Sequence, residues 1–254
     1  MIDISITIVA YNNQADVRDA VRSIMEHTNG RLSKKIYIVD NSTEANQLSS
    51  LAEEYEDVVY QRPGGNLGFG GGHNYVLPEL DSQYHAIVNP DILLTEDSFF
   101  VLLSFLKQSQ AGMAVPRLLD EQGNLQAVYR RDLTVFDMAV RMFLPSHFCK
   151  RQHYHTMQDM DYGKPFPVPF AQGSFLVIRT ELFRELGGFD ERYFMYMEDA
   201  DLCKRVNDVS SLWYCPDTAV IHKWERGSHK DMRLLRIHIS SMFRYFCKWG
   251  WKLW

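Results

Sequence analysis

Short runs of β-forming residues alternate with amphipathic stretches over the first half of the chain. Strands are expected where apolar residues alternate or form short runs, and helices where they recur every three to four positions. Strands interspersed with helices are typical of βαβ units, so we expect an α/β fold with a mostly parallel central sheet flanked by helices. The pattern predicts strands at 4–9, 35–39, 58–60 and 85–88, and helices near 15–26, 45–55 and 96–107.

The second half of the chain is less regular. Aromatic, histidine and proline residues crowd 145–169 without a clear period, which predicts a long loop. A strand at 174–178, a helix at 180–186 and a strand at 218–221 are expected after it. From residue 232 onward, apolar and basic residues recur at helical spacing, which predicts a C-terminal amphipathic helical segment.

Polar clusters stand at the predicted carboxyl ends of four strands. Ligands of open α/β sheets bind beyond these ends, so we expect the clusters to converge on one binding edge. Their residues are Tyr11-Asn12-Asn13, Asp40-Asn41-Ser42, Gly64-Gly65-Asn66 and Asn89-Pro90-Asp91.

Asp40 has two interpretations on these residues alone. A carboxylate at a strand end can accept hydrogen bonds from a nucleobase or ribose. The sequence Asp-Asn-Ser also favours a simple turn, because these side chains bond to their own backbone.

The segment from Gly64 to Asn74 is rich in glycine, which lets the backbone approach a ligand closely. It leads into a predicted helix start, where free amides favour a phosphate or diphosphate. It is neither a Rossmann fingerprint nor a P-loop, because the third glycine of the first would fall on His73 and no Gly-Lys-Ser/Thr follows for the second. A flexible surface loop is the alternative.

Asp91 could hold Mg²⁺ or Mn²⁺ against a diphosphate, since hard cations prefer oxygen ligands. His222, at the end of a predicted strand, is a candidate further ligand of that metal. A helix cap or turn for Asp91, and a structural role for His222, are the alternatives.

Glu198-Asp199-Ala200-Asp201 places three carboxylates together just before a helical stretch. Neighbouring carboxylates raise one another's pKa, which can leave one of them as a general base near neutral pH. The alternative is that they stabilise the first turn of the helix.

Composition and charge narrow the class of protein to which the chain can belong. The 254 residues, 46% of them hydrophobic, can bury a sizeable core, and no apolar run reaches the roughly 20 residues of a spanning helix. The start of the chain reads as a strand, not as a signal peptide, so a cytoplasmic protein is expected. The net charge of −5 divides into +6 for residues 222–254 and −11 for the rest. A basic, aromatic tail on an acidic body favours an anionic membrane surface over nucleic acid. The alternative is a terminal helix that packs on the rest of the chain or on a second subunit.

Taken together, these motifs resemble family 2 glycosyltransferases, especially bacterial rhamnosyltransferases. The resemblance runs from the amino terminus to about His222. It is carried by Val9-Ala10-Tyr11-Asn12, Val39-Asp40-Asn41-Ser42, Asn66-Leu67-Gly68-Phe69-Gly70, Asn89-Pro90-Asp91, Gly173-Ser174-Phe175 and Phe194-Met195-Tyr196-Met197-Glu198-Asp199-Ala200-Asp201-Leu202-Cys203.

This resemblance implies a GT-A fold and an inverting transferase that uses Mg²⁺ or Mn²⁺. Asp40 would face the base or ribose, Asp91 would be the metal-binding end of the family's DXD motif, and Asp199, beside Glu198, would be the catalytic base. Together with the strand-end clusters, it gives a predicted donor site of Ala10, Tyr11, Asn12, Asp40, Asn41, Gly65, Asn66, Gly68, Phe69, Gly70, Asn74, Asn89 and Asp91.

Asn89 stands where the DXD motif usually has its first aspartate, which weakens the metal site. Rhamnosyltransferase-like members often carry Asn-Pro-Asp, so we expect dTDP-rhamnose as donor, with UDP-galactofuranose or a UDP-hexose as the alternative. The acceptor would be a lipid-linked or polysaccharide hydroxyl of O-antigen or capsule synthesis.

We expect residues 1–222 to form the catalytic domain, with 1–115 binding the nucleotide sugar, 116–222 binding the acceptor and 223–254 forming the tail. The sequence leaves a homodimer open. A nucleotidyltransferase is disfavoured because no glycine-rich basic loop follows the first strand. A non-catalytic glycan-binding module would not need both Asp91 and Asp199.

Overall fold

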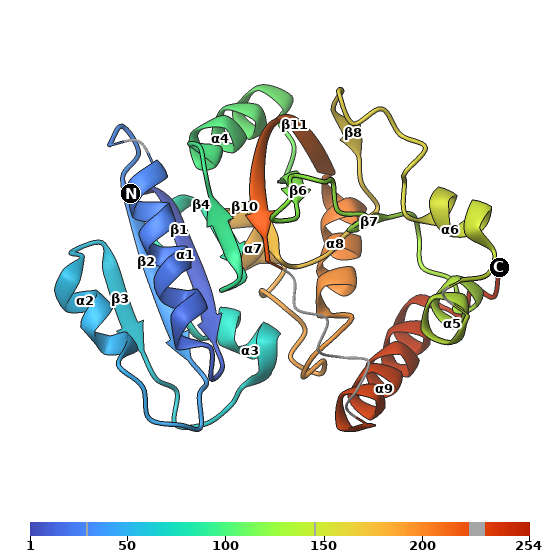
Figure 1. Ribbon diagram of the computed structural model, residues 1–254, viewed down its shortest axis with the longest axis horizontal. Helices are drawn as coiled ribbons and strands as arrows, with labels where there is room; N and C mark the ends of the chain where they lie inside the picture. Colours follow the sequence, from blue (N-terminus) through green and yellow to red (C-terminus); the bar gives the residue numbers. More distant parts are fainter. Residues whose placement is uncertain (29, 145, 224–231) are drawn as a thin grey trace.

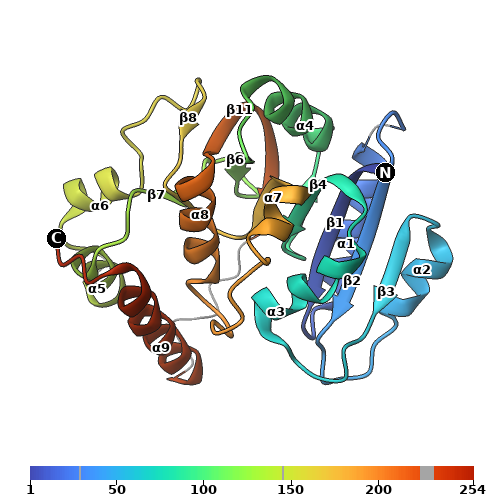
Figure 2. The ribbon, with the colours of Figure 1, turned by 180° about the vertical axis from the view of Figure 1, so that it is seen from behind.

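The computed structural model of the chain describes residues 1–28, 30–144, 146–223 and 232–254 (Figure 1). Within them a nine-stranded sheet crosses the molecule in the order β3-β2-β1-β4-β10-β6-β11-β5, and β8 pairs with β11. Helices lie on both sides of this sheet (Figures 1 and 2). Its strands are β1 (Ile2–Ala10), β2 (Lys34–Asp40), β3 (Val58–Gln61), β4 (Ser82–Val88), β5 (Ile92–Leu94), β6 (Met113–Leu119), β8 (Phe166–Pro167), β10 (Phe175–Arg179) and β11 (Leu212–His222).

The predicted parallel order holds for the first half of the sheet. Strand β1 pairs in parallel with β2 and β4, and β2 pairs in parallel with β3. Ile4 and Ile6 of β1 are fully buried, and so is Ser5 between them, because helices cover both faces. The elements of this half are α1 (Gln14–His27), η1 (Leu48–Ser50), α2 (Leu51–Glu54), α3 (Gly68–Tyr75) and η2 (Leu77–Glu79).

The helix predicted over 45–55 is shorter than expected. Only η1 and α2 are helical there. The side chain of Asn46 donates to Asp40 Oδ2 (2.9 Å) and accepts from the Leu48 N–H (3.0 Å). These bonds hold the chain in a turn beside Asp40, which delays the start of the helix.

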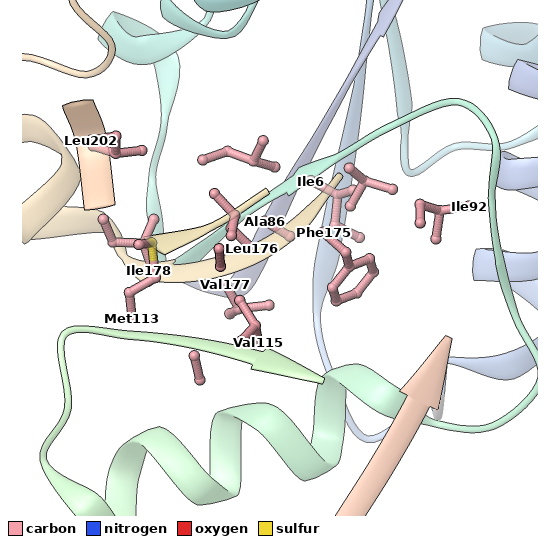
Figure 3. Close-up of a cluster of buried hydrophobic side chains, with 14 of the residues drawn as sticks. Ile6, Ala86, Ile92, Met113, Val115, Phe175, Leu176, Val177, Ile178 and Leu202 are labelled. Carbon is pink, nitrogen blue, oxygen red and sulfur yellow. The ribbon is translucent and has the colours of Figure 1, made fainter. Parts of the chain in front are cut away.

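Antiparallel strands enter the sheet in the second half. Strand β10 lies antiparallel between β4 and β6, whereas β11 runs parallel to β6 and antiparallel to β5. The central strands share one core, in which apolar side chains of β1, β4, β6 and β10 lie close together (Figure 3). The two halves of the chain are therefore joined by one continuous sheet. This half also contains α4 (Ser98–Ser109), α7 (Thr180–Glu185), α8 (Glu198–Val209) and the two-stranded sheet of β7 (Tyr129–Arg130) and β9 (Phe170–Ala171).

The predicted loop at 145–169 is partly helical, because α6 (Cys149–His155) lies within it. This helix packs beside α5 (Val135–Phe143), where Arg151 Nε lies 2.6 Å from Asp137 Oδ1. The aromatic and basic residues that broke the periodicity bind neighbouring elements instead of forming an apolar stripe. Helix α6 therefore shows no repeat of apolar residues every three to four positions in the sequence.

The predicted C-terminal helix is α9 (Met232–Trp249), and it packs on the body beside α5 (Figures 1 and 2). Lys248 Nζ lies 2.6 Å from Asp201 Oδ1, and Trp249 Nε1 donates to the same oxygen (2.8 Å). Beyond the helix, the backbone carbonyl of Lys252 accepts from the Val135 N–H (2.9 Å). No helix in the described part of the chain is long and apolar enough to cross a membrane.

Candidate active site

The loops after β1, β2 and β3 meet at one edge of the sheet, as predicted. Ala10 lies opposite Asp40 in the register of β1 and β2, and the Asn12 N–H donates to Ser42 Oγ (2.9 Å). Beside them is a cavity of about 360 Å³. Of the predicted donor-binding residues, it is lined by Asp40, Asn41, Gly65 and Asn66; Arg62 also lines it.

Asp40 is buried and fully engaged at the wall of this cavity. Its Oδ1 accepts from the Ser42 N–H (3.0 Å), and its Oδ2 accepts from Asn46 and from the Tyr60 hydroxyl (2.7 Å). Burial alone would raise the pKa of the Asp40 carboxyl, but hydrogen bonds from Ser42, Tyr60 and Asn46 together hold it below its ordinary value. Asp40 is therefore a fixed, ionised acceptor. It forms the local turn that its sequence favours, and it also lines the cavity.

Most of the glycine-rich segment, from Gly68 onward, is itself the helix α3, and only residues 64–67 form a loop in front of it. Its first amides already have partners in the protein: the Gly68 N–H donates to Asn66 Oδ1 (2.8 Å) and the Phe69 N–H to the Phe194 carbonyl (3.2 Å). A Cβ on Gly72 would lie 2.7 Å from a Val9 methyl. The glycines therefore allow α3 to pack closely on β1, and two amides expected to face a diphosphate are already occupied.

Two further residues of the predicted donor site serve the packing of α3. A Cβ on Gly70 would lie 2.9 Å from Phe189 Cβ. Asn74 donates to the Phe189 carbonyl (2.8 Å) and accepts from the Phe189 N–H (2.8 Å), which ties α3 to the chain before α8. Gly68, Gly70 and Asn74 line neither the cavity beside Asp40 nor a second cavity at the start of α8. The side chain of Tyr11 is exposed.

Asp91 and His222 lie together, as predicted for a metal site. His222 Nε2 is 3.4 Å from Asp91 Oδ2, and His222 Nδ1 is 2.7 Å from Gln126 Oε1. The other end of the Gln126 amide donates to the His222 carbonyl (2.8 Å), so Oε1 must face Nδ1 and accept its proton. Nε2 is then the ring nitrogen that faces the carboxylate. The described residues contain no group of three carboxylate, imidazole or thiol ligands around this pair.

A second cavity, of about 300 Å³, is lined by two of the three carboxylates of the predicted acidic cluster. Glu198 and Asp199 begin α8 and face this cavity together with Asn89 and Phe69. Asp199 Oδ2 accepts from the Gly173 N–H (3.1 Å) and Oδ1 from the Ala200 N–H (2.8 Å). The carboxylate that the sequence predicted as the base is thus held in a fixed orientation at a cavity wall.

Burial raises the pKa of both acidic groups. The pKa of Glu198 lies well above its ordinary value, first because of burial and then because of the charge of Asp199. The pKa of Asp199 is also raised by burial, while the amides of Gly173 and Ala200 and the charge of Arg130 oppose the rise. The pair therefore favours a protonated Glu198 and an ionised Asp199 that accepts a proton more readily than an ordinary aspartate.

The turn before α8 orients Glu198 and Asp199 toward the cavity. Tyr196 and Met197 have left-handed backbone conformations, with φ of 67° and 72°. Such conformations cost about 1–3 kcal/mol each in residues other than glycine and are concentrated at functional sites. The ring of His238 on α9 stacks on Tyr196 at 4.6 Å between centroids, so the C-terminal helix supports the same turn.

Asp201 does not belong to this site. Its oxygens lie 2.8 Å from Arg205 Nε and 2.6 Å from Lys248 Nζ. It therefore anchors α9, and the third carboxylate of the predicted cluster is structural. Sequence reasoning missed several polar residues that line the cavity instead: Arg130, Arg141, Gln172, Ser174 and His238.

Comparison with known proteins decides the family. The family model described as glycosyl transferase family 2 matches residues 5–187, which is most of the chain. The chain belongs to glycosyltransferase family 2. This glycosyltransferase is 26% identical to rhamnosyltransferase WbbL of Escherichia coli over 91% of its own length and 89% of the relative. It is 27% identical to N-acetylglucosaminyl-diphospho-decaprenol L-rhamnosyltransferase of Mycobacterium tuberculosis over 77% of its length and 68% of the relative.

Solved structures agree on the GT-A fold of this glycosyltransferase. The crystal structure of GalNAc-T7 with UDP, GalNAc and Mn²⁺ superposes with a TM-score of 0.67 at 17% identity. The chain is covered over 89% of its length but spans only 44% of that neighbour. TarS of S. aureus in complex with UDP-GlcNAc gives 0.62 at 13% identity, with 89% of this chain and 60% of that one covered. The enzyme is thus a glycosyltransferase of glycan synthesis with a GT-A fold.

Proposed function

We propose that this glycosyltransferase transfers L-rhamnose from dTDP-rhamnose to a hydroxyl of a lipid-linked or polysaccharide acceptor in cell-envelope glycan synthesis. The observation that carries the chemistry is Asp199, a half-buried carboxylate fixed by two backbone amides at the wall of a cavity. The donor and acceptor assignments are supported by the two rhamnosyltransferase relatives, one of which is named for a diphospho-decaprenol substrate. UDP-galactofuranose and UDP-hexoses are the alternative donors.

The reaction is a single in-line displacement. Asp199 removes the proton of the acceptor hydroxyl as its oxygen attacks the anomeric carbon, and the nucleoside diphosphate leaves from the opposite face with inversion. The raised pKa of Asp199 suits this step, because a stronger base accepts the proton more readily. Asp40 and the loop at Gly65 and Asn66 would hold the nucleoside, so residues 1–115 serve the donor and 116–222 mainly the acceptor.

A divalent metal fits the pair of Asp91 and His222. The buried Asp91 Oδ1 has no hydrogen-bond partner among the described residues, and His222 Nε2 lies 3.4 Å from Asp91 Oδ2. Asp91 and His222 would hold Mg²⁺ or Mn²⁺, which would offset negative charge on the departing diphosphate. Asn89 contributes no charge, so the remaining ligands would come from the donor and water.

We also place the enzyme at the inner face of the cytoplasmic membrane, as a peripheral protein. The C-terminal helix and the elements beside it expose large apolar side chains, which suit the headgroup region of a bilayer. Lys248 and Lys252 are already paired with Asp201 and Asp132, so apolar contact contributes more than the tail's net charge suggests. The exposed side chains, here called the apolar face, are Phe143, Leu144, Phe148, Ile239, Phe243, Trp251, Leu253 and Trp254.

A donor panel tests the transfer. Purified enzyme is incubated with dTDP-rhamnose, UDP-galactofuranose and UDP-hexoses, with a sugar diphospho-lipid as acceptor, and both the released nucleoside diphosphate and the glycan product are measured. We expect product mainly from dTDP-rhamnose, with far less nucleotide released when the acceptor is omitted. Preferential use of a UDP-sugar would overturn the donor assignment, and no product from any donor would overturn the transfer itself.

The metal and membrane parts have separate tests. Excess EDTA should abolish transfer, and Mn²⁺ should restore it. Asp91→Ala should weaken donor binding in Mn²⁺ but not in EDTA. Full activity in EDTA would contradict the metal.

The double variant Phe243→Ser with Trp251→Ser tests the membrane surface. It should reduce binding to anionic liposomes at least about tenfold, because burying an aromatic side chain contributes about 1.5–3 kcal/mol. Val209→Ser, at an exposed apolar residue of α8, is the control. Equal binding of both proteins would contradict the membrane face.

A further inference from the structure

Two arginines face the cavity that holds the acidic pair. Arg130 comes from β7 and Arg141 from α5, and both line the cavity with Asp199. Arg130 is only 5% exposed. Burial, and then the charge of Arg141, lower the pKa of the Arg130 guanidinium. A buried cation with a second, half-buried cation close to it is unfavourable unless an anion lies beside them.

The protein itself offers these arginines little compensation. Arg130 Nε has no hydrogen-bond partner among the described residues, and the guanidinium lies 5.2 Å from the centre of the Phe170 ring. Asp199 is the acid whose charge favours both arginines, but within the described residues its carboxylate bonds to two backbone amides and to neither guanidinium. The raised pKa of Glu198 favours its neutral form. Two cations then share the cavity with one carboxylate.

Other polar atoms of this cavity also lack partners within the described residues. Gln172 Oε1, Ser174 Oγ and Glu198 Oε2 are buried without a hydrogen bond. Buried polar atoms in folded proteins are nearly always paired, so a cluster of unpaired ones at a cavity indicates a ligand. A ligand that is rich in hydroxyls and also carries an anionic group would pair both with these polar atoms and with the two arginines.

We propose that Arg130 and Arg141 bind a phosphate or diphosphate group of the acceptor, next to the hydroxyl that is presented to Asp199. Arginine suits this role because its planar guanidinium donates two parallel hydrogen bonds to phosphate oxygens. The inference rests on the proposed transfer to a lipid-linked acceptor, and it adds the residues that recognise that acceptor.

The position of the arginines favours the acceptor over the donor. The donor's nucleoside and diphosphate are assigned above to the loops after β2 and β3 and to Asp91, whereas β7 and α5 belong to the second half of the chain. Helix α5 runs from near this cavity to Phe143, where the apolar face begins. A hydrocarbon chain attached to a phosphate at Arg141 would therefore lie near the C-terminal end of α5 and beside α9, whose His238 lines the same cavity. Figure 2 shows both helices at this end of the molecule.

The test compares two acceptors with the same sugar, one a short-chain lipid diphosphate and the other an uncharged alkyl glycoside. Arg130→Met and Arg141→Met should lower kcat/KM for the diphosphate acceptor about 10–100-fold, as expected for a charged hydrogen bond, and should change it little for the uncharged one. The donor's Kd should stay the same. Arg131→Met, at an arginine that pairs with Asp159 outside this cavity, is the matched control.

Each other result has a distinct meaning. Equal losses on both acceptors would overturn the phosphate subsite and make the arginines positioning residues for Asp199, with the acid limb of the pH profile moved in the variants. A weakened donor Kd would overturn it in favour of the donor's diphosphate. If the unmodified enzyme transfers no sugar to either acceptor, the proposed function fails, whereas transfer with equal losses on both removes only the present inference.

A direct binding measurement covers the case in which the arginine variants are inactive or unstable. Calorimetry with geranyl diphosphate should show binding to the unmodified enzyme, weaker binding to Arg130→Lys, whose melting temperature is checked first, and unchanged binding to Arg131→Met. Inorganic pyrophosphate should compete with the lipid if the diphosphate is recognised. Equal binding of geranyl diphosphate by the unmodified enzyme and Arg130→Lys, or its absence in both, would overturn the proposal.

Discussion

Asp40 and Asp199 both line a cavity at the end of a regular element, Asp40 buried and Asp199 half-buried, yet they lie in opposite surroundings. Asp40 accepts hydrogen bonds from a backbone amide, an asparagine and a tyrosine, and its pKa is lowered. Asp199 accepts only from two backbone amides and stands beside Glu198, and its pKa is raised. The first environment suits a permanent acceptor for a ligand, and the second suits a group that takes up a proton. Hydrogen-bond partners, more than burial, separate binding from proton transfer here.

The largest effect should come from Asp199→Asn, which removes the proton acceptor while keeping the shape of the side chain. A general base contributes about 10²–10⁴-fold to rate, so kcat should fall by that factor while the donor's Kd changes little. Single-turnover kinetics and calorimetry with the donor measure the two quantities. Asp208→Asn, at an exposed aspartate of the same helix, serves as the control. Near-normal turnover of a folded Asp199→Asn enzyme would remove this residue from the reaction.

Asp40→Asn should change the other quantity. It leaves the Tyr60 hydroxyl and the Ser42 amide without a charged acceptor, so we expect the donor's Kd to rise about 10–100-fold, with kcat at saturating donor largely kept. Calorimetry with the nucleoside diphosphate measures this. Tyr60→Phe, which removes one of the bonds, should give a smaller loss. A fall in kcat without a change in Kd would contradict the contrast between the two aspartates.

The pH dependence should separate the two sites without mutation. Because the pKa of Asp199 is raised above 3.8, kcat at saturating donor should fall as the pH drops through that higher pKa. Because the pKa of Asp40 is lowered below 3.8, donor affinity should persist to lower pH before it declines. Parallel pH profiles of kcat and donor Kd test this. Coincident acid limbs would show that one group controls both steps.

The smallest effect concerns how α9 is held. Lys248→Met leaves Asp190 and the buried Asp201 each short of one cation, so the free energy of unfolding should drop by about 1–3 kcal/mol. Chemical denaturation measures it. Lys164→Met breaks an ion pair whose side chains are 79% and 63% exposed, and it should cost less than about 1 kcal/mol. Equal losses in the two variants would mean that α9 is not anchored through Lys248.

The sequence predicted the parallel half of the fold well, because the period of its strands and helices is strong and local. It could not predict the place of β10, since the antiparallel pairing with β4 joins residues far apart in the chain. Likewise, Asp40, Asp91 and Asp199 stand out as strand-end or helix-start carboxylates. Arg130 and Arg141 do not, because a buried arginine and an exposed one such as Arg22 look alike in sequence, and only the tertiary structure separates them.

The acidic triplet shows the same limit more sharply. Asp199 and Asp201 are two residues apart on α8, and helical geometry turns them toward different neighbours. One faces the cavity and the other faces Lys248. The sequence does not show that α9 packs against Asp201, so Asp199 and Asp201 are predicted to form one cluster.

Helix α3 has a consequence for engineering this enzyme. Replacing glycine by alanine inside a helix is a common route to thermostability and normally contributes up to about 1 kcal/mol. At Gly68, Gly70 and Gly72 the added methyl would lie less than 3.0 Å from neighbouring atoms, so these replacements should weaken the protein. A stabilising library built from helix propensity alone would thus fail in this helix, and loop glycines such as Gly30, with no atom within 4 Å of the added methyl, are better places to begin.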